Sequence, residues 1–115
     1  MKKVLLSDIP KTGEPLYEMQ TFAQLQGPTG GVSMSYITLL PGKRVPDAGF
    51  SCHDADEYSF FLDGSVYTES GDFKGLCAAG EGTLIPMGEK HWCENRTDKP
   101  CTLVCALVKK ENAKC

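Results

Sequence analysis

Short runs of apolar and polar residues, separated by turn residues, occupy most of the 115-residue chain. The pattern is clearest at residues 32–40, VSMSYITLL, where β-branched and aromatic residues alternate with polar ones before Pro41-Gly42. Similar runs predict further strands at residues 3–7, 57–62, 65–70, 73–77, 82–86, 91–95 and 101–108. Strands this short, with turn residues about every eight to twelve positions, are typical of an all-β sandwich or barrel.

The segment EPLYEMQTFAQLQ, residues 14–26, carries two competing patterns. Met19 and Phe22 fit one face of a helix, whereas Met19 and Thr21 fit one face of a strand. We expect a strand or irregular structure here.

Composition and charge narrow the class of protein. Apolar residues make up 41% of the chain and charged residues 23%, as in ordinary globular proteins, and the length predicts a single domain over residues 1–115. The net charge is -3, and Lys2-Lys3 and Lys109-Lys110 are isolated pairs, so we expect no nucleic-acid partner. The apolar runs are too short for a membrane span or a signal-peptide core, so we expect a cytoplasmic protein without a membrane partner.

The chain has six cysteines, at positions 52, 77, 93, 101, 105 and 115. An even number is compatible with a disulfide framework, but a cytoplasmic protein keeps its thiols reduced. There is no C-x-x-C pair, which gives a zinc ribbon or a redox motif no support. We therefore expect the cysteines to act as small buried residues, with a free thiol at the C-terminus.

Both histidines of the chain fall within spaced motifs. The stretch GEGTLIPMGEKHWCEN fits the pattern G-x5-P-x-G-x2-H-x3-N at all its fixed positions, Gly80, Pro86, Gly88, His91 and Asn95. The stretch GFSCHDADEYSFFLDG fits H-x3-E-x6-G at His53, Glu57 and Gly64. These motifs resemble those of the cupin superfamily, and the resemblance covers about residues 32–108. It implies an all-β, double-stranded β-helix (jelly-roll) barrel.

The spacing of the candidate ligands is consistent with a metal site. Alternate residues of a strand share a face, so Ser51, His53 and Glu57 point the same way if the strand continues through them. If His91 faces them across a small barrel, two imidazoles and one carboxylate converge, which is the triad that suits Fe(II) and similar ions. Without a metal, the same residues would be hydrogen-bonded groups at the mouth of the barrel.

The resemblance implies a divalent ion held by His53, Glu57 and His91, with Ser51 standing where the family pattern has a further histidine. The ion would be iron, manganese, zinc, nickel or cobalt. Cys93 lies two residues after His91, and a thiolate there would shift selectivity toward zinc or copper. The alternative for Cys93 is a small buried residue of the barrel.

Other residues near the motifs are candidates for supporting roles. Tyr36 and Glu94 are polar groups that could act as acid or base. Phe61 shares the parity of Glu57 and is expected to line the pocket. The other aromatic residues around the motifs are expected in the core or at a subunit interface, and they are Phe50, Tyr58, Phe60 and Trp92.

These observations support more than one function. The first is a small metal-dependent enzyme acting on a compact polar substrate by isomerisation, lyase chemistry or dioxygenation. The second is a non-catalytic barrel that binds or senses a small ligand. The third is a structural dimer with a relic site, whose mouth would be plugged by side chains such as Phe61, Met87 or Trp92. Resemblance to the family also implies a homodimer, paired through the outer faces of the sheets.

Overall fold

The computed structural model describes residues 1–27 and 30–110 of the chain. Within these residues, one short 3-10 helix precedes nine strands: η1 (Leu6–Asp8), β1 (Tyr17–Gly27), β2 (Gly30–Leu39), β3 (Arg44–Val45), β4 (Ala55–Asp63), β5 (Ser65–Ser70), β6 (Phe73–Ala78), β7 (Gly82–Ile85), β8 (His91–Glu94) and β9 (Cys101–Lys110). The described residues contain no helix long and apolar enough to cross a membrane.

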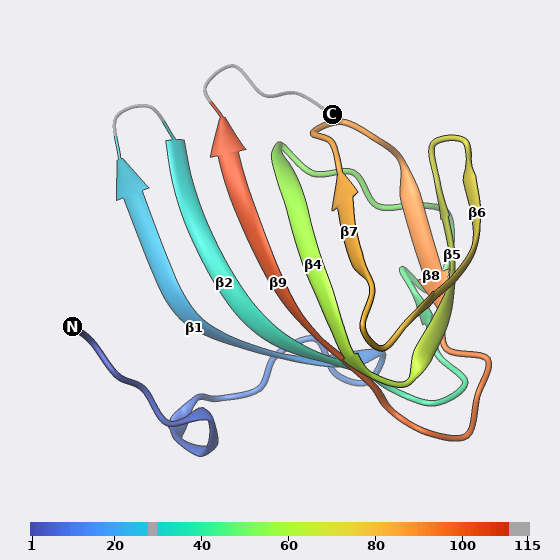
Figure 1. Ribbon diagram of the computed structural model, residues 1–115, viewed down its shortest axis with the longest axis horizontal. Coiled ribbons are helices and arrows are strands. Elements are labelled where there is room, and N and C mark those ends of the chain that lie inside the picture. The colour runs from blue at the N-terminus through green and yellow to red at the C-terminus, as the bar shows by residue number, and fades with distance from the viewer. Residues whose placement is uncertain (28–29, 111–115) are drawn as a thin grey trace.

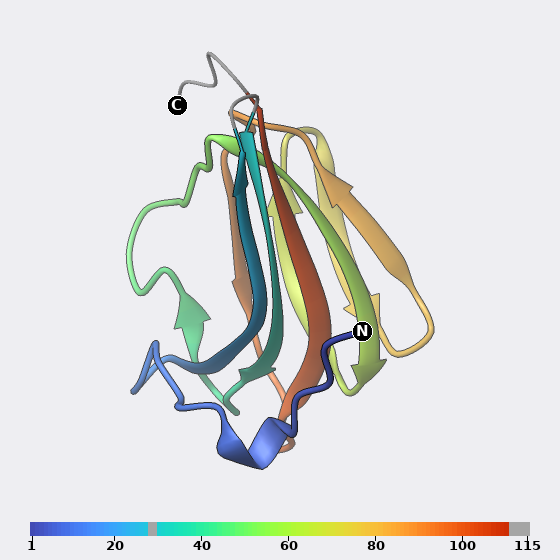
Figure 2. The same cartoon turned by 90° about the vertical axis from the view of Figure 1, so that its left-hand side faces the viewer.

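The strands form two antiparallel sheets that face each other. One sheet has the order β1-β2-β9-β4-β7 and the other β3-β8-β5-β6 (Figures 1 and 2). The all-β, jelly-roll prediction is confirmed, although the described strands form two sheets and not a closed barrel. In Figure 1 the sheets converge at the lower end of the molecule, where β4 ends and β9 begins.

Most of the predicted strands correspond to observed ones. The ambiguous segment at residues 14–26 contains β1, which pairs with β2 and has an irregular register between Thr21 and Ala23. The strand predicted at residues 3–7 is wrong. This segment leads into the 3-10 helix, whose carbonyl at Leu6 accepts a hydrogen bond of 2.9 Å from the buried Gln20 side chain. Val4 and Leu5 stay exposed, because an apolar run this short has no sheet to pack on.

The core lies between the two sheets and follows the period of two. Its buried members come from both sheets, and they are Leu39, Phe61, Val66, Cys77, Cys101, Leu103 and Cys105. On β4, Phe61 points inward and is 5% exposed, whereas its neighbour Phe60 points outward and is 51% exposed. Of the two places expected for the aromatic residues, the core or a subunit interface, Phe61 occupies the core, and Phe60 lies on the outer surface.

The cysteines mostly act as small buried residues, as expected. Cys77, Cys101 and Cys105 are buried free thiols, and Cys93 is a half-buried one. Cys52, in contrast, is disulfide-bonded, so the expectation of fully reduced thiols is wrong at this position. The free C-terminal thiol expected at Cys115 lies outside the described residues.

Asn95, the last fixed residue of the second motif, closes the narrow end of the interior. It is 1% exposed, and its Nδ2 donates to the carbonyls of Leu39 at 3.0 Å and Lys99 at 2.7 Å. Its Oδ1 accepts from the backbone N–H of Thr97 at 3.0 Å and from the Thr97 hydroxyl at 2.6 Å. A buried amide needs partners for both donor and acceptor, and the end of β2 together with the β8–β9 connection supplies them. Asn95 therefore has a structural role.

Candidate metal centre

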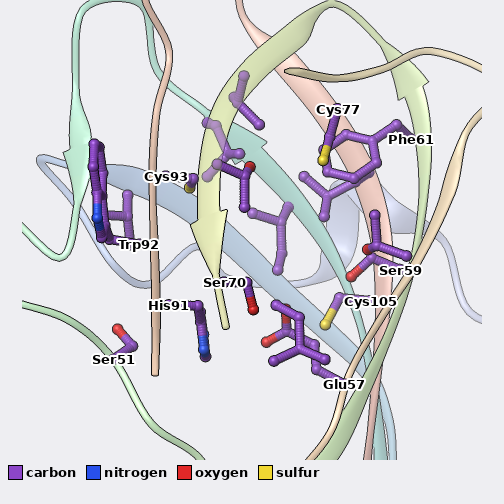
Figure 3. A pocket seen from close by; sticks show the side chains of 18 of the residues that line it. Ser51, Glu57, Ser59, Phe61, Ser70, Cys77, His91, Trp92, Cys93 and Cys105 are labelled. Atoms are coloured by element: carbon purple, nitrogen blue, oxygen red, sulfur yellow. The ribbon is translucent and has the colours of Figure 1, made fainter. Parts of the chain in front are cut away.

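The structure brings His53, Glu57 and His91 together at the wide end of the interior. Each offers one ligand atom, and the three atoms lie within 4.8 Å of one another. His53 Nε2 lies 3.4 Å from Glu57 Oε1, and the two imidazole rings lie 5.0 Å apart between centroids. In Figure 3, Glu57 and His91 approach the same space from facing sheets.

The two histidines reach this space in different ways. His91 is the first residue of β8, and its backbone exchanges hydrogen bonds of 2.7 and 3.0 Å with Ser51. His53 lies between this bridge and the start of β4 at Ala55, so the continuous strand expected from Ser51 to Glu57 is interrupted. The carbonyl of His53 accepts a 3.0 Å hydrogen bond from the N–H of Gly88, which holds the loop in place.

The turn before His91 explains two fixed positions of the motif. Gly88 has φ of +83°, a left-handed conformation that favours glycine, and its N–H is the one that donates to His53. The preceding N–H, of Met87, donates to Asp56 Oδ1 at 2.9 Å. The turn thus ties β7 and β8 to the start of β4, and it sets the distance between the two histidines.

The hydrogen bonding of His91 fixes which ring nitrogen is free. Its Nδ1 lies 2.9 Å from the backbone carbonyl oxygen of Glu89. A carbonyl oxygen only accepts hydrogen bonds, so Nδ1 carries the proton in this contact. In the neutral ring, the lone pair therefore resides on Nε2. A ligand histidine is commonly oriented in this way by a backbone carbonyl on its other nitrogen.

The neighbouring carboxylates are engaged elsewhere. Asp54 pairs with Lys109 Nζ at 3.0 Å, and this hydrogen bond lowers the pKa of the Asp54 carboxyl group. Asp56 is buried and accepts from the N–H of Met87. Glu57 is left as the carboxylate of this acidic stretch that faces the two imidazoles.

Cys93 and Ser51 lie close to the site, but neither joins the cluster of ligand atoms found in the described part of the chain. Burial raises the pKa of the Cys93 thiol to about 12, and the nearby Glu57 carboxylate adds to the shift. Ser51 lies beside His91 in Figure 3, in the place that the motif gives to a further histidine.

Behind the triad, a cavity of about 480 Å³ extends between the two sheets. The strand register divides its lining into three layers. The mouth layer consists of Glu57, Ser70, His91 and Leu107. The middle layer consists of Ser35, Ser59, Thr68, Cys93 and Cys105. The floor layer consists of Ile37, Phe61, Val66, Cys77 and Leu103. Phe61 lines the cavity, as predicted from its parity with Glu57.

Two polar groups at the mouth were not found from the sequence. The Ser70 hydroxyl donates to Glu89 Oε2 at 2.6 Å, and both residues line the cavity. Glu89 lies two residues before His91, and this parity was the available signal. The residues proposed as acid or base, Tyr36 and Glu94, are not part of the lining. Tyr36 alternates with the inward-facing Ser35, and Glu94 pairs with Arg96 Nε at 2.6 Å.

Comparisons with known proteins show which fold the chain has. No protein-family model and no curated protein sequence matches the chain. Among solved structures, it is similar to an RmlC-like cupin from Shewanella frigidimarina, with a TM-score of 0.71, 11% identity, and coverage of 95% of this chain and 91% of that one. KdgF from Halomonas sp. has a TM-score of 0.72, 13% identity and coverage of 94% of each chain.

A third similar structure is the polyketide cyclase RemF from Streptomyces resistomycificus. It has a TM-score of 0.74 and 16% identity, and the match covers 99% of this chain and 84% of that one. Sequence identities this low establish the fold alone. The chain therefore has the fold of the cupin superfamily, as the two motifs predicted.

Proposed function

We propose that this protein is a divalent-metal-dependent enzyme in which His53, Glu57 and His91 hold the ion and a small substrate binds through its oxygen atoms. The observation that carries the proposal is the convergence of three ligand atoms within 4.8 Å. His53 and Glu57 belong to one motif and His91 to the other, and the fold brings the two motifs together. Enzymes among the neighbours of similar fold, such as a polyketide cyclase, are consistent with it.

The residues fit the ion in distance and in chemistry. With metal–ligand bonds of about 2.0 to 2.2 Å, adjacent ligands of one ion lie roughly 3 to 3.6 Å apart. The 3.4 Å between His53 Nε2 and Glu57 Oε1 is already in this range. Two imidazoles and one carboxylate suit iron, manganese, zinc, nickel or cobalt, and three protein ligands leave positions open to a substrate.

The chain's own residues supply the rest of the chemistry. A bound ion polarises a substrate oxygen or activates water or dioxygen, as isomerase, lyase or dioxygenase chemistry would require. Glu89 is the carboxylate that can accept or return a proton at the mouth, and the Ser70 hydroxyl orients it at 2.6 Å. Ser70 is buried and Glu89 is half-buried, which excludes part of the surrounding water.

A second candidate function is a non-catalytic module that binds a small ligand. It is favoured by the lining below the mouth, where most side chains are apolar or thiols. The idea of a structural dimer with a plugged, relic site is less well supported, because a cavity of about 480 Å³ lies behind the triad. Turnover of a substrate separates the first two candidates.

Metal content tests the proposal. We expect near-stoichiometric divalent metal, measured by elemental mass spectrometry, in protein purified without an affinity tag or chelator. His91→Ala and Glu57→Gln should lose it, since each removes one of three ligands. Glu94→Gln is the matched control, because this carboxylate on β8 is paired with Arg96 outside the cavity, and it should retain the metal. Circular dichroism would confirm that each variant is folded.

One result would contradict the proposal. If the parent protein holds no metal after reconstitution with divalent ions under reducing conditions, the triad is a hydrogen-bonded group and not a metal site. The ligand-binding module would then be the better description.

A further inference from the structure

The polarity of the cavity falls steadily from its mouth to its floor. Charged and metal-binding groups are confined to the mouth, where Glu57, Glu89 and His91 lie. The middle layer carries only hydroxyls and thiols. The floor layer is apolar, and its largest side chain, Phe61, is 5% exposed. Free cysteine behaves as a small apolar residue, so Cys77 at the floor and Cys105 above it extend this apolar surface.

One polar atom in the middle layer has only a weak partner. Ser59 is 8% exposed and lines the cavity, and among the described residues its Oγ has no hydrogen-bond partner stronger than the Cys105 thiol. Its polar neighbour across the sheet is the Cys105 thiol, which bonds only weakly. The Ser59 oxygen is almost fully covered, so Ser59 presents little polar surface to the cavity, and the middle layer suits an apolar group better than a hydroxyl-bearing one.

We propose that the ligand of this cavity is a small amphiphilic oxyacid or dicarbonyl compound. Its oxygen atoms bind at the mouth, and its branched or aromatic body fills the middle and floor layers. This inference rests on the proposed function, because His53, Glu57 and His91 receive the oxygen atoms through the ion. It refines the expectation of a compact polar substrate by giving the molecule one polar end.

The chemistry of the lining separates this class from sugars. A sugar carries hydroxyl groups around its whole ring, and each of them loses hydrogen bonds to water when it enters the cavity. The floor layer offers no polar side chain beyond the Cys77 thiol, and the lining beyond it adds Tyr17, so most of those hydroxyls would stay unpaired. The apolar body of an amphiphilic ligand, in contrast, gains binding free energy when this surface buries it. The volume of about 480 Å³ is within the range of about 300 to 1,000 Å³ usual for small-molecule sites.

Binding of a graded series of 2-oxo acids tests the inference. The probes are pyruvate, 2-oxobutanoate, 4-methyl-2-oxopentanoate and phenylpyruvate, which share one chelating head and differ in their apolar body. The protein is loaded with Co²⁺, whose visible absorption reports coordination, and affinity is measured by calorimetry. We expect affinity to rise roughly fourfold for each additional buried methylene group. We also expect each acid to change the Co²⁺ spectrum.

The variant Ser59→Leu fills the middle layer without touching a metal ligand. It also removes a buried hydroxyl whose best partner is a thiol, so the unfolding midpoint should stay the same or rise. We expect phenylpyruvate to bind at least tenfold more weakly, with pyruvate and Co²⁺ binding unchanged within twofold. Ser65→Leu is the matched control, because Ser65 precedes the buried Val66 on β5 and does not line the cavity. It should leave the whole series unchanged.

The two failures are distinguishable. If Co²⁺ gives no protein-bound spectrum, both the proposed function and the polar half of this inference are overturned. If the spectrum forms but affinity is flat or falls along the series, the metal site stands and the apolar body is wrong. An equal loss of phenylpyruvate binding in Ser59→Leu and Ser65→Leu would also overturn the assignment to the middle layer.

Discussion

The two ends of the space between the sheets are built from the same strands but serve different needs. At the narrow end, Val66, Asn95 and Cys101 are each less than 2% exposed, and Asn95 has partners for its donors and its acceptor. At the wide end, the His53 side chain is 38% exposed, and among the described residues Ser59 Oγ has no partner stronger than the Cys105 thiol. Stability is therefore concentrated at one end and binding capacity at the other.

Phe61 at the floor should show the largest effect. Replacing it by alanine removes a buried ring next to an existing cavity, so Phe61→Ala should lower the free energy of unfolding by about 3 to 5 kcal/mol. Chemical denaturation measures the loss. The adjacent Phe60→Ala should cost less than about 1 kcal/mol, because this ring is half exposed on the outer face. Equal losses would mean that the interior does not carry the stability.

Asn95 and Glu57 are polar residues at opposite ends of the interior, and the stabilities of their variants can be compared. Asn95→Ala should lower the free energy of unfolding by about 2 to 4 kcal/mol, because the carbonyls of Leu39 and Lys99 lose their donor in a buried place. Glu57→Gln should change the metal-free protein by less than about 1 kcal/mol while abolishing metal binding. Denaturation curves of both variants with a chelator present would measure this. If Glu57→Gln lowered the free energy of unfolding more than Asn95→Ala, the assignment of stability to the narrow end would be wrong.

Ionisation of the Cys101 thiol at the narrow end should make the free energy of unfolding depend on pH in the alkaline range. Burial raises the pKa of Cys101 to about 11, whereas an exposed thiol titrates near about 8.5. A group whose pKa is raised by folding contributes its stability in full at low pH. That contribution falls between about pH 8.5 and 11, by up to about 1.4 kcal/mol per pH unit. Cys101→Val should make the decline shallower under reducing conditions, and an unchanged slope would exclude this thiol as its source.

The outer face of β4 should show the smallest effect on folding. Tyr58, Phe60 and Leu62 are each about half exposed there, an unusually apolar set for a surface. We expect a second copy of the chain to cover them, since one apolar patch is self-complementary across a two-fold axis. Phe60→Lys should convert a dimer into a monomer, measured by light scattering, with the free energy of unfolding of the monomer nearly unchanged. A monomeric parent at micromolar concentration would contradict this.

Much of the fold and the centre of the site could be predicted from the sequence. Turn residues separate the strands clearly, and the fixed spacings located His53, Glu57 and His91. The strand at residues 3–7 was wrongly predicted, because a short apolar run looks the same whether or not a neighbouring strand is free to pair. Arg44–Val45 was missed, since two residues cannot show a period.

The supporting residues of the site were harder to predict. Ser59 and Glu89 share the parity of Glu57 and His91, but parity does not tell which of the two faces has a cavity. Tyr36 was proposed as an acid or base because parity alone did not tell which face of its strand is inside. It lies on the outer face, since its neighbour Ser35 lines the cavity. The interruption at His53 also could not be seen, because it depends on a bridge between Ser51 and β8.

The separation of the lining into layers has a consequence for evolution. The residues that would hold the ion lie on one level, and those that would shape the rest of the ligand lie one or two strand steps away. A substitution at Ser59 or Thr68 can therefore change which molecule fits, while the ion and the narrow end keep their contacts. New specificities should be reachable in this scaffold by single mutations that cost little stability.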